Sequence, residues 1–188
     1  EGVPDAKGDF ILRNLRAGTY RLHLQLPSAA WYFRSVTLGP NTKATDWKVI
    51  SDGVNVKQSV SGLTVTISEG AAGIRGRLTV TEGQRLPSRT VVYLVPAEKE
   101  NTTNLLRFFE ARAEGDGSFN IRNVVPGEYL IHARATESDT PRIISIREDS
   151  DLRTAITREA ERAKQSVTLK ACERLENYEF GYPPAIKP

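Results

Sequence analysis

Residues 117–133 read Gly-Ser-Phe-Asn-Ile-Arg-Asn-Val-Val-Pro-Gly-Glu-Tyr-Leu-Ile-His-Ala, and residues 8–24 read Gly-Asp-Phe-Ile-Leu-Arg-Asn-Leu-Arg-Ala-Gly-Thr-Tyr-Arg-Leu-His-Leu. Seven residues of the earlier segment recur 109 positions later: Gly8, Phe10, Arg13, Asn14, Gly18, Tyr20 and His23. Recurrence at a fixed offset indicates a duplicated structural unit. A second similarity, between residues 57–60 and 164–167, has an offset of 107 positions. Together the two offsets predict two related domains that differ slightly in length.

The duplicated segment predicts two strands joined by a tight turn. Phe119 and Ile121 alternate with polar residues, which is the period of a half-buried strand. Pro126 and Gly127 then supply the dihedral angles of a type II turn. In the strand after the turn, the residues predicted to face inward are Tyr129, Ile131 and Ala133 in one copy and Tyr20, Leu22, Leu24 and Leu26 in the other.

Short strands separated by turn residues recur along the rest of the chain. They are predicted at residues 32–38, 63–67, 74–80, 90–95, 142–146 and 167–171. Many short strands of this kind favour an all-β fold of antiparallel β-sandwiches. Residues 150–165 differ, because their apolar residues have helical spacing and capping residues stand at the start. One short helix is therefore predicted over the second sandwich.

The domain boundary is predicted in the glycine-containing segment 68–73. We expect residues 1–69 to form the C-terminal part of a first sandwich, residues 70–180 a complete second sandwich, and residues 181–188 a tail. The second copy has about 45 residues before its Gly-x-Phe strand, whereas the first has seven. The first domain is therefore expected to lack its opening strands, which an upstream segment, a protein partner or a neighbouring subunit would supply.

Composition excludes several classes of function. The hydrophobic fraction of 39% and the charged fraction of 26% indicate a globular protein rather than a disordered one. The net charge of +3 is small and the basic residues are scattered among acids, so nucleic acid is not a predicted partner. No apolar run approaches the ~20 residues of a membrane-spanning helix, so direct membrane insertion is not predicted. A single cysteine excludes a disulfide framework.

No catalytic, cofactor-binding or metal-binding residue is predicted. His23 and His132 occupy equivalent positions and are expected to face solvent on separate sheets. Cys172 is expected to be a buried thiol, with an intermolecular disulfide or a lipid link as alternatives. The acidic residues Glu114, Asp116 and Asp5 are typical of turns, and calcium binding is the alternative reading.

The clearest surface feature predicted from the sequence is a group of aromatic residues. If Val36 faces the core, strand alternation directs Trp31 and Phe33 outward, and Trp47 follows a loop later. Exposed aromatic rings can stack on sugars or contact a protein. Alternatively, residues 41–52 or the absent strands cover them. Trp31, Phe33 and Trp47 are therefore candidate contacts for a protein partner or a glycan.

The motifs resemble those of carboxypeptidase regulatory-like domains, which are related to the transthyretin (prealbumin-like), starch-binding-like and Cna-B-type sandwiches. The matching residues run from Ile74 to Leu78, from Val92 to Pro96, and from Asp116 through the Pro126-Gly127 turn to Tyr129. The first domain matches only the later half of this pattern, and Ala17 replaces the usual proline. The segment 31–39 also resembles a stretch of large bacterial envelope proteins that carry such domains in tandem.

The resemblance implies a fold more sharply than an activity, because these domains serve as added modules in proteins of many kinds. We expect a non-enzymatic, exported structural or interaction module of a larger bacterial envelope or extracellular protein, in the periplasm, on the outer membrane surface or outside the cell. A carbohydrate-binding module is the first alternative. An accessory domain of a secreted peptidase is the second.

Overall fold

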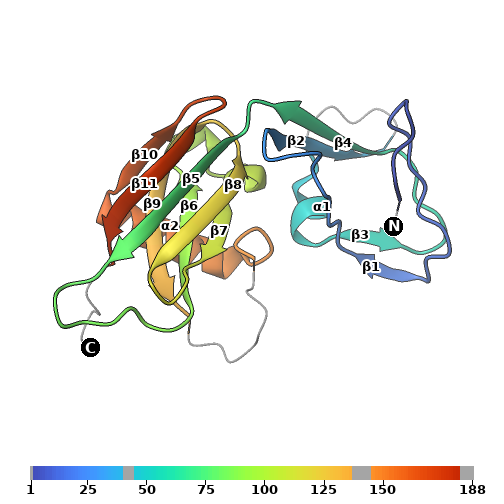
Figure 1. The fold of residues 1–188 in the computed structure, drawn as a ribbon. Helices are drawn as coiled ribbons and strands as arrows, with labels where there is room; N and C mark the ends of the chain where they lie inside the picture. Colours follow the sequence, from blue (N-terminus) through green and yellow to red (C-terminus); the bar gives the residue numbers. More distant parts are fainter. Residues whose placement is uncertain (1, 40–44, 137–144, 183–188) are drawn as a thin grey trace.

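The computed structural model describes residues 2–39, 45–136 and 145–182, and it confirms the all-β prediction (Figure 1). The elements are β1 (Gly18–Tyr20), β2 (Trp31–Leu38), α1 (Trp47–Ser51), β3 (Val54–Val56), β4 (Leu63–Glu69), β5 (Ala72–Thr79), β6 (Thr90–Pro96), the 3-10 helices η1 (Lys99–Asn101) and η2 (Leu105–Arg107), β7 (Phe109–Arg112), β8 (Ser118–Val124), β9 (Gly127–Ala135), α2 (Ser150–Ala163), β10 (Ser166–Leu169) and β11 (Arg174–Gly181). Within the described residues, no helix has the length and apolar character needed to cross a membrane.

The strands from β5 to β11 form a sandwich, called here the C-terminal unit. One sheet has the order β10-β9-β6-β7 and the other the order β11-β5-β8. Alternate residues of the two sheets meet in the core, as predicted for Phe119, Ile121, Tyr129, Ile131 and Ala133, all of which are buried. The period-2 pattern of the sequence therefore identified the inward face of β8 and β9 correctly.

Strand β6 is buried along its whole length because both of its faces are covered. Val92 and Leu94 face the three-stranded sheet. Val91, Tyr93 and Val95 form a second cluster, whose members from α2 are Ile156 and Ala160. Helix α2 thus lies on the outer face of the four-stranded sheet and gives this unit a third layer.

Helix α2 begins and ends at local signals in the sequence. The side chain of Asp149 accepts hydrogen bonds from the backbone N–H groups of Asp151 and Leu152, both at 2.9 Å, and so caps the helix. The helix ends at Ala163, two residues before the predicted end, because Lys164 takes a left-handed conformation with φ of 54°.

The antiparallel prediction is wrong for one strand pair, since β11 runs parallel to β5. No hairpin joins these strands: the chain reaches β11 from β10, which lies in the opposite sheet. The register shifts between Leu175 and Tyr178, and Asn177 there has φ of 56°. Gly76 permits the close approach, because a Cβ atom at this position would overlap the backbone of Tyr178 and the ring of Phe119.

The strands from β1 to β4 form a smaller N-terminal unit of two two-stranded sheets, β1-β3 and β2-β4. Its buried core contains Val36, Val49, Val54 and Val56. The predicted inward strand through Leu26 is shorter than expected, because β1 ends at Tyr20 and Leu24 is 40% exposed. The equivalent strand β9 is flanked by β6 on one side and β10 on the other, whereas β1 pairs with β3 alone among the described strands.

The duplication is visible in backbone geometry as well as in sequence. The hydroxyl of Tyr20 donates to the carbonyl of Arg16, four residues earlier, as that of Tyr129 donates to the carbonyl of Val125. Asn14 and its counterpart Asn123 both take positive φ, 60° and 58°. The two copies therefore share the conformation that joins their strands.

The second similarity, between residues 57–60 and 164–167, has no structural counterpart. In β10, Val167 pairs with Tyr129, whereas in β3 it is Val54 that pairs with the equivalent Tyr20. Residues 57–60 lie beyond β3 and are exposed. The offset of 107 positions is therefore a coincidence of sequence.

The structure tests one further strand prediction only in part, and it also bears on the predicted domain boundary at residues 68–73. Residues 142–144 of the predicted strand 142–146 lie outside the described residues, while Ser145 and Ile146 belong to no strand, with Ile146 in a turn. Gly70 and Ala71 separate β4 from β5, and none of the described sheets contains strands from both sides of them.

Candidate interaction surfaces

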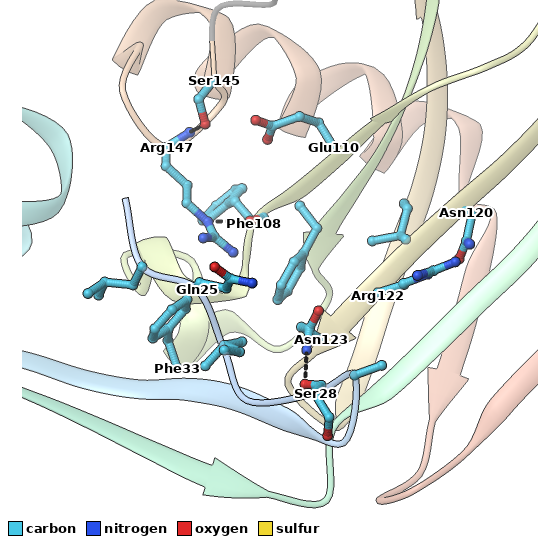
Figure 2. Close-up of a pocket in the computed structure, with 15 residues that line it drawn as sticks. Gln25, Ser28, Phe33, Phe108, Glu110, Asn120, Arg122, Asn123, Ser145 and Arg147 are labelled. Carbon is cyan, nitrogen blue, oxygen red and sulfur yellow. Dashed lines mark hydrogen bonds between the residues drawn. The ribbon is translucent and has the colours of Figure 1, made fainter. Parts of the chain in front are cut away.

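A cleft lies between the two units. It comprises a cavity of about 540 Å³ and an adjoining one of about 360 Å³, which share Leu24, Phe33, Glu110, Ser145 and Arg147. Figure 2 shows the larger cavity, with Gln25 and Phe33 of the N-terminal unit on one side and Arg147 and Glu110 of the C-terminal unit on the other.

The Arg147 guanidinium is held inside the cleft wall. Its Nε donates a hydrogen bond of 2.7 Å to the carbonyl of Phe108, and its Cζ lies 4.8 Å from the ring centre of Phe109 (Figure 2). Desolvation by burial lowers the pKa of Arg147, partly opposed by the nearby negative charge of Glu110. This arginine is therefore anchored to the framework of the C-terminal unit.

Glu110 is the acidic counterpart in the same wall. Burial raises the pKa of its carboxyl group, and this effect is opposed by a hydrogen bond with Ser145 and by the charge of Arg147. The cleft offers polar and aromatic contacts, and within its wall a hydrogen bond joins Glu110 and Ser145.

Four polar contacts join the two units. The side-chain amide of Asn123 donates to the carbonyl of Ser28 at 3.0 Å (Figure 2). It also donates to the carbonyl of Trp31 at 2.7 Å. The guanidinium of Arg174 donates to the carbonyl of Ala29 at 2.6 Å. An ion pair of 3.4 Å joins Arg21 to Glu148. These contacts fix the segment before β2 against the C-terminal unit.

Of the three predicted contact residues, Trp31, Phe33 and Trp47, only Phe33 lines the cleft. Trp31 and Phe33 lie on β2 and Trp47 begins α1, and each is partly buried. The prediction that Phe33 faces away from Val36 is wrong, since both line the smaller cavity. The reason is a β-bulge: Phe33 pairs with Ile67 and Ser35 with Thr66, so Arg34 is the extra residue that interrupts the alternation.

The largest unpredicted feature is a set of exposed apolar side chains. Every exposed large apolar residue that the structure describes lies in the N-terminal unit: Val3, Ile11, Leu12, Leu15, Leu24 and Val60. The C-terminal unit shows none over its described residues. The expectation that the first sandwich is incomplete was the signal from which this surface could have been predicted.

The solvent-facing prediction fails for His132. Only 7% of this residue is exposed, because α2 covers the face of β9 on which it lies, and its Nε2 is 3.1 Å from Oε2 of Glu159 on α2. His23 is exposed, as predicted. Desolvation lowers the pKa of His132, Glu159 partly offsets this effect, and Arg134 adds to it.

The lowered pKa predicts a specific pH dependence of stability. The unfolded chain binds a proton at His132 more readily than the folded chain, so this residue costs stability as the pH falls below about 6.5. We expect His132→Gln to make the free energy of unfolding less sensitive to pH between 7.5 and 5.5. Urea titrations at several pH values measure this, with His23→Gln as the control for loss of an exposed histidine. An unchanged slope in His132→Gln would contradict the assignment.

Two minor predictions are also resolved. Cys172 is exposed rather than buried, because β10 ends at Leu169 and Cys172 lies in the following turn with φ of 63°. Asp116 accepts from the backbone N–H of Ser118 and pairs with Arg77, as a turn residue does. Across the described residues, no three His, Cys, Asp or Glu side chains gather in a way that could hold a metal ion.

Comparisons with known proteins add little. No protein-family profile matches the chain, and no curated protein matches it. Among solved structures, the Bacillus anthracis TIE protein matches at 12% sequence identity and a TM-score of 0.33, over 64% of this chain. The match spans 19% of that protein's length. A similarity of this strength assigns neither a family nor a function.

Proposed function

We propose that this chain is a non-enzymatic interaction module of a larger assembly, exported to the bacterial cell envelope or beyond it. The single observation that carries the proposal is that the exposed large apolar side chains of the described residues all belong to one of the two units. All six lie on the N-terminal unit, whose sheets have two strands each. Apolar side chains that are exposed in one copy and buried at equivalent positions of the other indicate a surface that a contact could cover.

The exposed fractions of side chains can be compared at equivalent positions of the two copies. Leu12 is 41% exposed and Leu15 is 39% exposed, whereas their counterparts Ile121 and Val124 are 3% and 0% exposed. The same apolar pattern therefore forms a core in one unit and a surface in the other. Burial of each such side chain by a partner would contribute about 1–3 kcal/mol before the costs of association.

The C-terminal unit suits the role of a support. Its core is closed, α2 covers its outer face, and the contacts of Asn123 and Arg174 hold the N-terminal unit against it. The motifs around Pro126-Gly127 support membership among the carboxypeptidase regulatory-like domains, which act as modules beside other domains. Membership of that kind also supports export.

Site-specific photocrosslinking tests the proposal. A photoreactive amino acid at Ile11, incorporated in the full-length protein in the cells that produce it, is expected to give a crosslinked adduct of discrete mass. The matched position is Glu161, which is exposed on α2 of the C-terminal unit. Equal labelling at the two positions, or no adduct at Ile11, would refute a partner surface on the N-terminal unit.

Carbohydrate binding is the second candidate, because Trp31, Phe33 and Trp47 each keep part of their surface exposed and Phe33 lines the cleft. Aromatic faces of this kind can stack on sugar rings. A glycan array compares the chain with Trp31→Ala and Trp47→Ala. Binding that both substitutions abolish would support this candidate, and an array without signal would remove it.

A further inference from the structure

We infer that residues 9–15 are the acceptor edge for an added β-strand whose sequence pattern resembles that of this chain's own β5. The inference deepens the proposed function and rests on it. The incoming strand runs antiparallel to residues 9–15, with a glycine opposite Phe10 and a large aliphatic residue opposite Leu12. The occupant is thus defined by its pattern rather than by a name.

The turn before the acceptor segment has the backbone hydrogen bonds of its counterpart in the other copy. The N–H of Asp5 donates to the carbonyl of Asp9 and the N–H of Gly8 to that of Asp5, both at 2.9 Å. In the other copy, Glu114, Ser118 and Gly117 make the same two bonds, at 2.8 and 2.9 Å. The turn that leads into β8 is therefore reproduced before residue 9, although no described strand pairs with residues 9–15.

Strand β8 shows what this conformation binds. Its neighbour is β5, in an antiparallel register that pairs Ile74 with Ile121 and Gly76 with Phe119. A Cβ atom at Gly76 would come within 2.8 Å of the Phe119 ring, so the aromatic residue requires a glycine across from it. Phe10 stands at the position of Phe119, and the same requirement follows there.

A basic residue is the third feature of the sequence pattern expected in the incoming strand. Arg77 of β5 pairs with Ser118, and the residue equivalent to Ser118 is Asp9. A basic residue one position after the glycine would therefore stand across from a carboxylate. The predicted occupant reads large aliphatic, any residue, glycine, basic residue, large aliphatic, as in residues 74–78.

A labelled peptide with the sequence of residues 71–80 tests the inference on the intact chain. We expect fluorescence anisotropy to detect binding, and amide exchange to slow at residues 9–15. Leu12→Asp should weaken binding by about tenfold or more, because Leu12 loses an apolar partner. Ile11→Ser is the matched control: its counterpart Asn120 faces outward, so binding should change by less than about twofold.

Two further variants test the register. The peptide with Gly76→Val should lose binding, because its side chain would meet Phe10. In a Cys172→Ser background and with oxidised glutathione as the oxidant, Ile11→Cys should form a disulfide with the peptide Arg75→Cys faster than with the peptide Arg77→Cys, since Arg75 pairs with Asn120 in the C-terminal unit. Binding that ignores Leu12→Asp, equal disulfide rates, or no binding at all would overturn the inference.

Failure here is distinguishable from failure of the proposed function. If the peptide does not bind while the photoreactive residue at Ile11 captures a partner, the interaction module stands and strand addition is overturned. If the peptide binds in register and no partner is captured at Ile11, the acceptor edge stands and the proposed function is refuted.

Discussion

Gly127→Ala is expected to destabilise the C-terminal unit by about 3 kcal/mol or more. Gly127 has φ of 153°, a conformation that residues with a Cβ atom rarely adopt. A Cβ atom here would also overlap the guanidinium of Arg107. That guanidinium cannot move aside easily, because it lies 5.1 Å from the ring centre of Tyr129 and 2.7 Å from a carboxylate oxygen of Glu98.

The duplication provides the matched control for this substitution. Gly18 holds the equivalent position, where a Cβ atom would meet only the ring edge of Tyr20, at 3.9 Å. Gly18→Ala should therefore change stability by less than about 1 kcal/mol. Both tryptophans, Trp31 and Trp47, lie in the N-terminal unit, so urea unfolding is followed there by fluorescence and over both units by circular dichroism. Equal losses in the two variants would contradict the explanation.

The parts of the fold that the sequence predicted are those with local signals. Strands β8 and β9 show clear period-2 alternation around a Pro-Gly turn, and α2 has a capping residue before a helical apolar pattern. Each of these signals lies within about ten residues, so no knowledge of distant contacts was needed. The inward faces of the C-terminal unit followed directly from them.

The parts that were missed depend on contacts between distant segments. Strand β11 was not predicted, because its residues are largely polar and only pairing with β5, about a hundred positions earlier, makes it a strand. The bulge at Arg34 is likewise set by the partner strand β4. The contact of His132 with Glu159 spans two elements that no local pattern connects.

Only part of the candidate surface could be predicted from the sequence, again because exposure depends on contacts between distant segments. The sequence predicts an incomplete first sandwich but not which of its side chains are exposed. Strand alternation favours the aromatic residues Trp31, Phe33 and Trp47 over Ile11 and Leu12. The alternation of apolar and polar residues predicts on which face of its own strand a side chain lies. Whether that side chain is exposed depends on whether a second strand lies across from it.

Glu98→Ala is the second substitution with a large expected effect, a loss of about 2–3 kcal/mol in the free energy of unfolding. The side chain of Arg107 is only 9% exposed, and Glu98 is the carboxylate that neutralises it, at 2.7 Å. The same carboxylate accepts from the backbone N–H of Glu128 at 3.2 Å and from the side chain of Asn101 at 2.8 Å. Truncation thus leaves a desolvated cation and two donors without their acceptor.

Two comparisons separate charge from hydrogen bonding in this cluster. Glu98→Gln keeps an acceptor but removes the charge, so it should lose less stability than Glu98→Ala if the hydrogen bonds dominate, and nearly as much if the buried charge of Arg107 dominates. Arg77→Ala breaks an ion pair whose side chains are 57% and 55% exposed, and should cost less than about 1 kcal/mol. A Glu98→Ala loss no larger than that of Arg77→Ala would show that water reaches Arg107. In that case the Gly127 constraint would also be weaker, because a hydrated guanidinium is free to move away from a new methyl group.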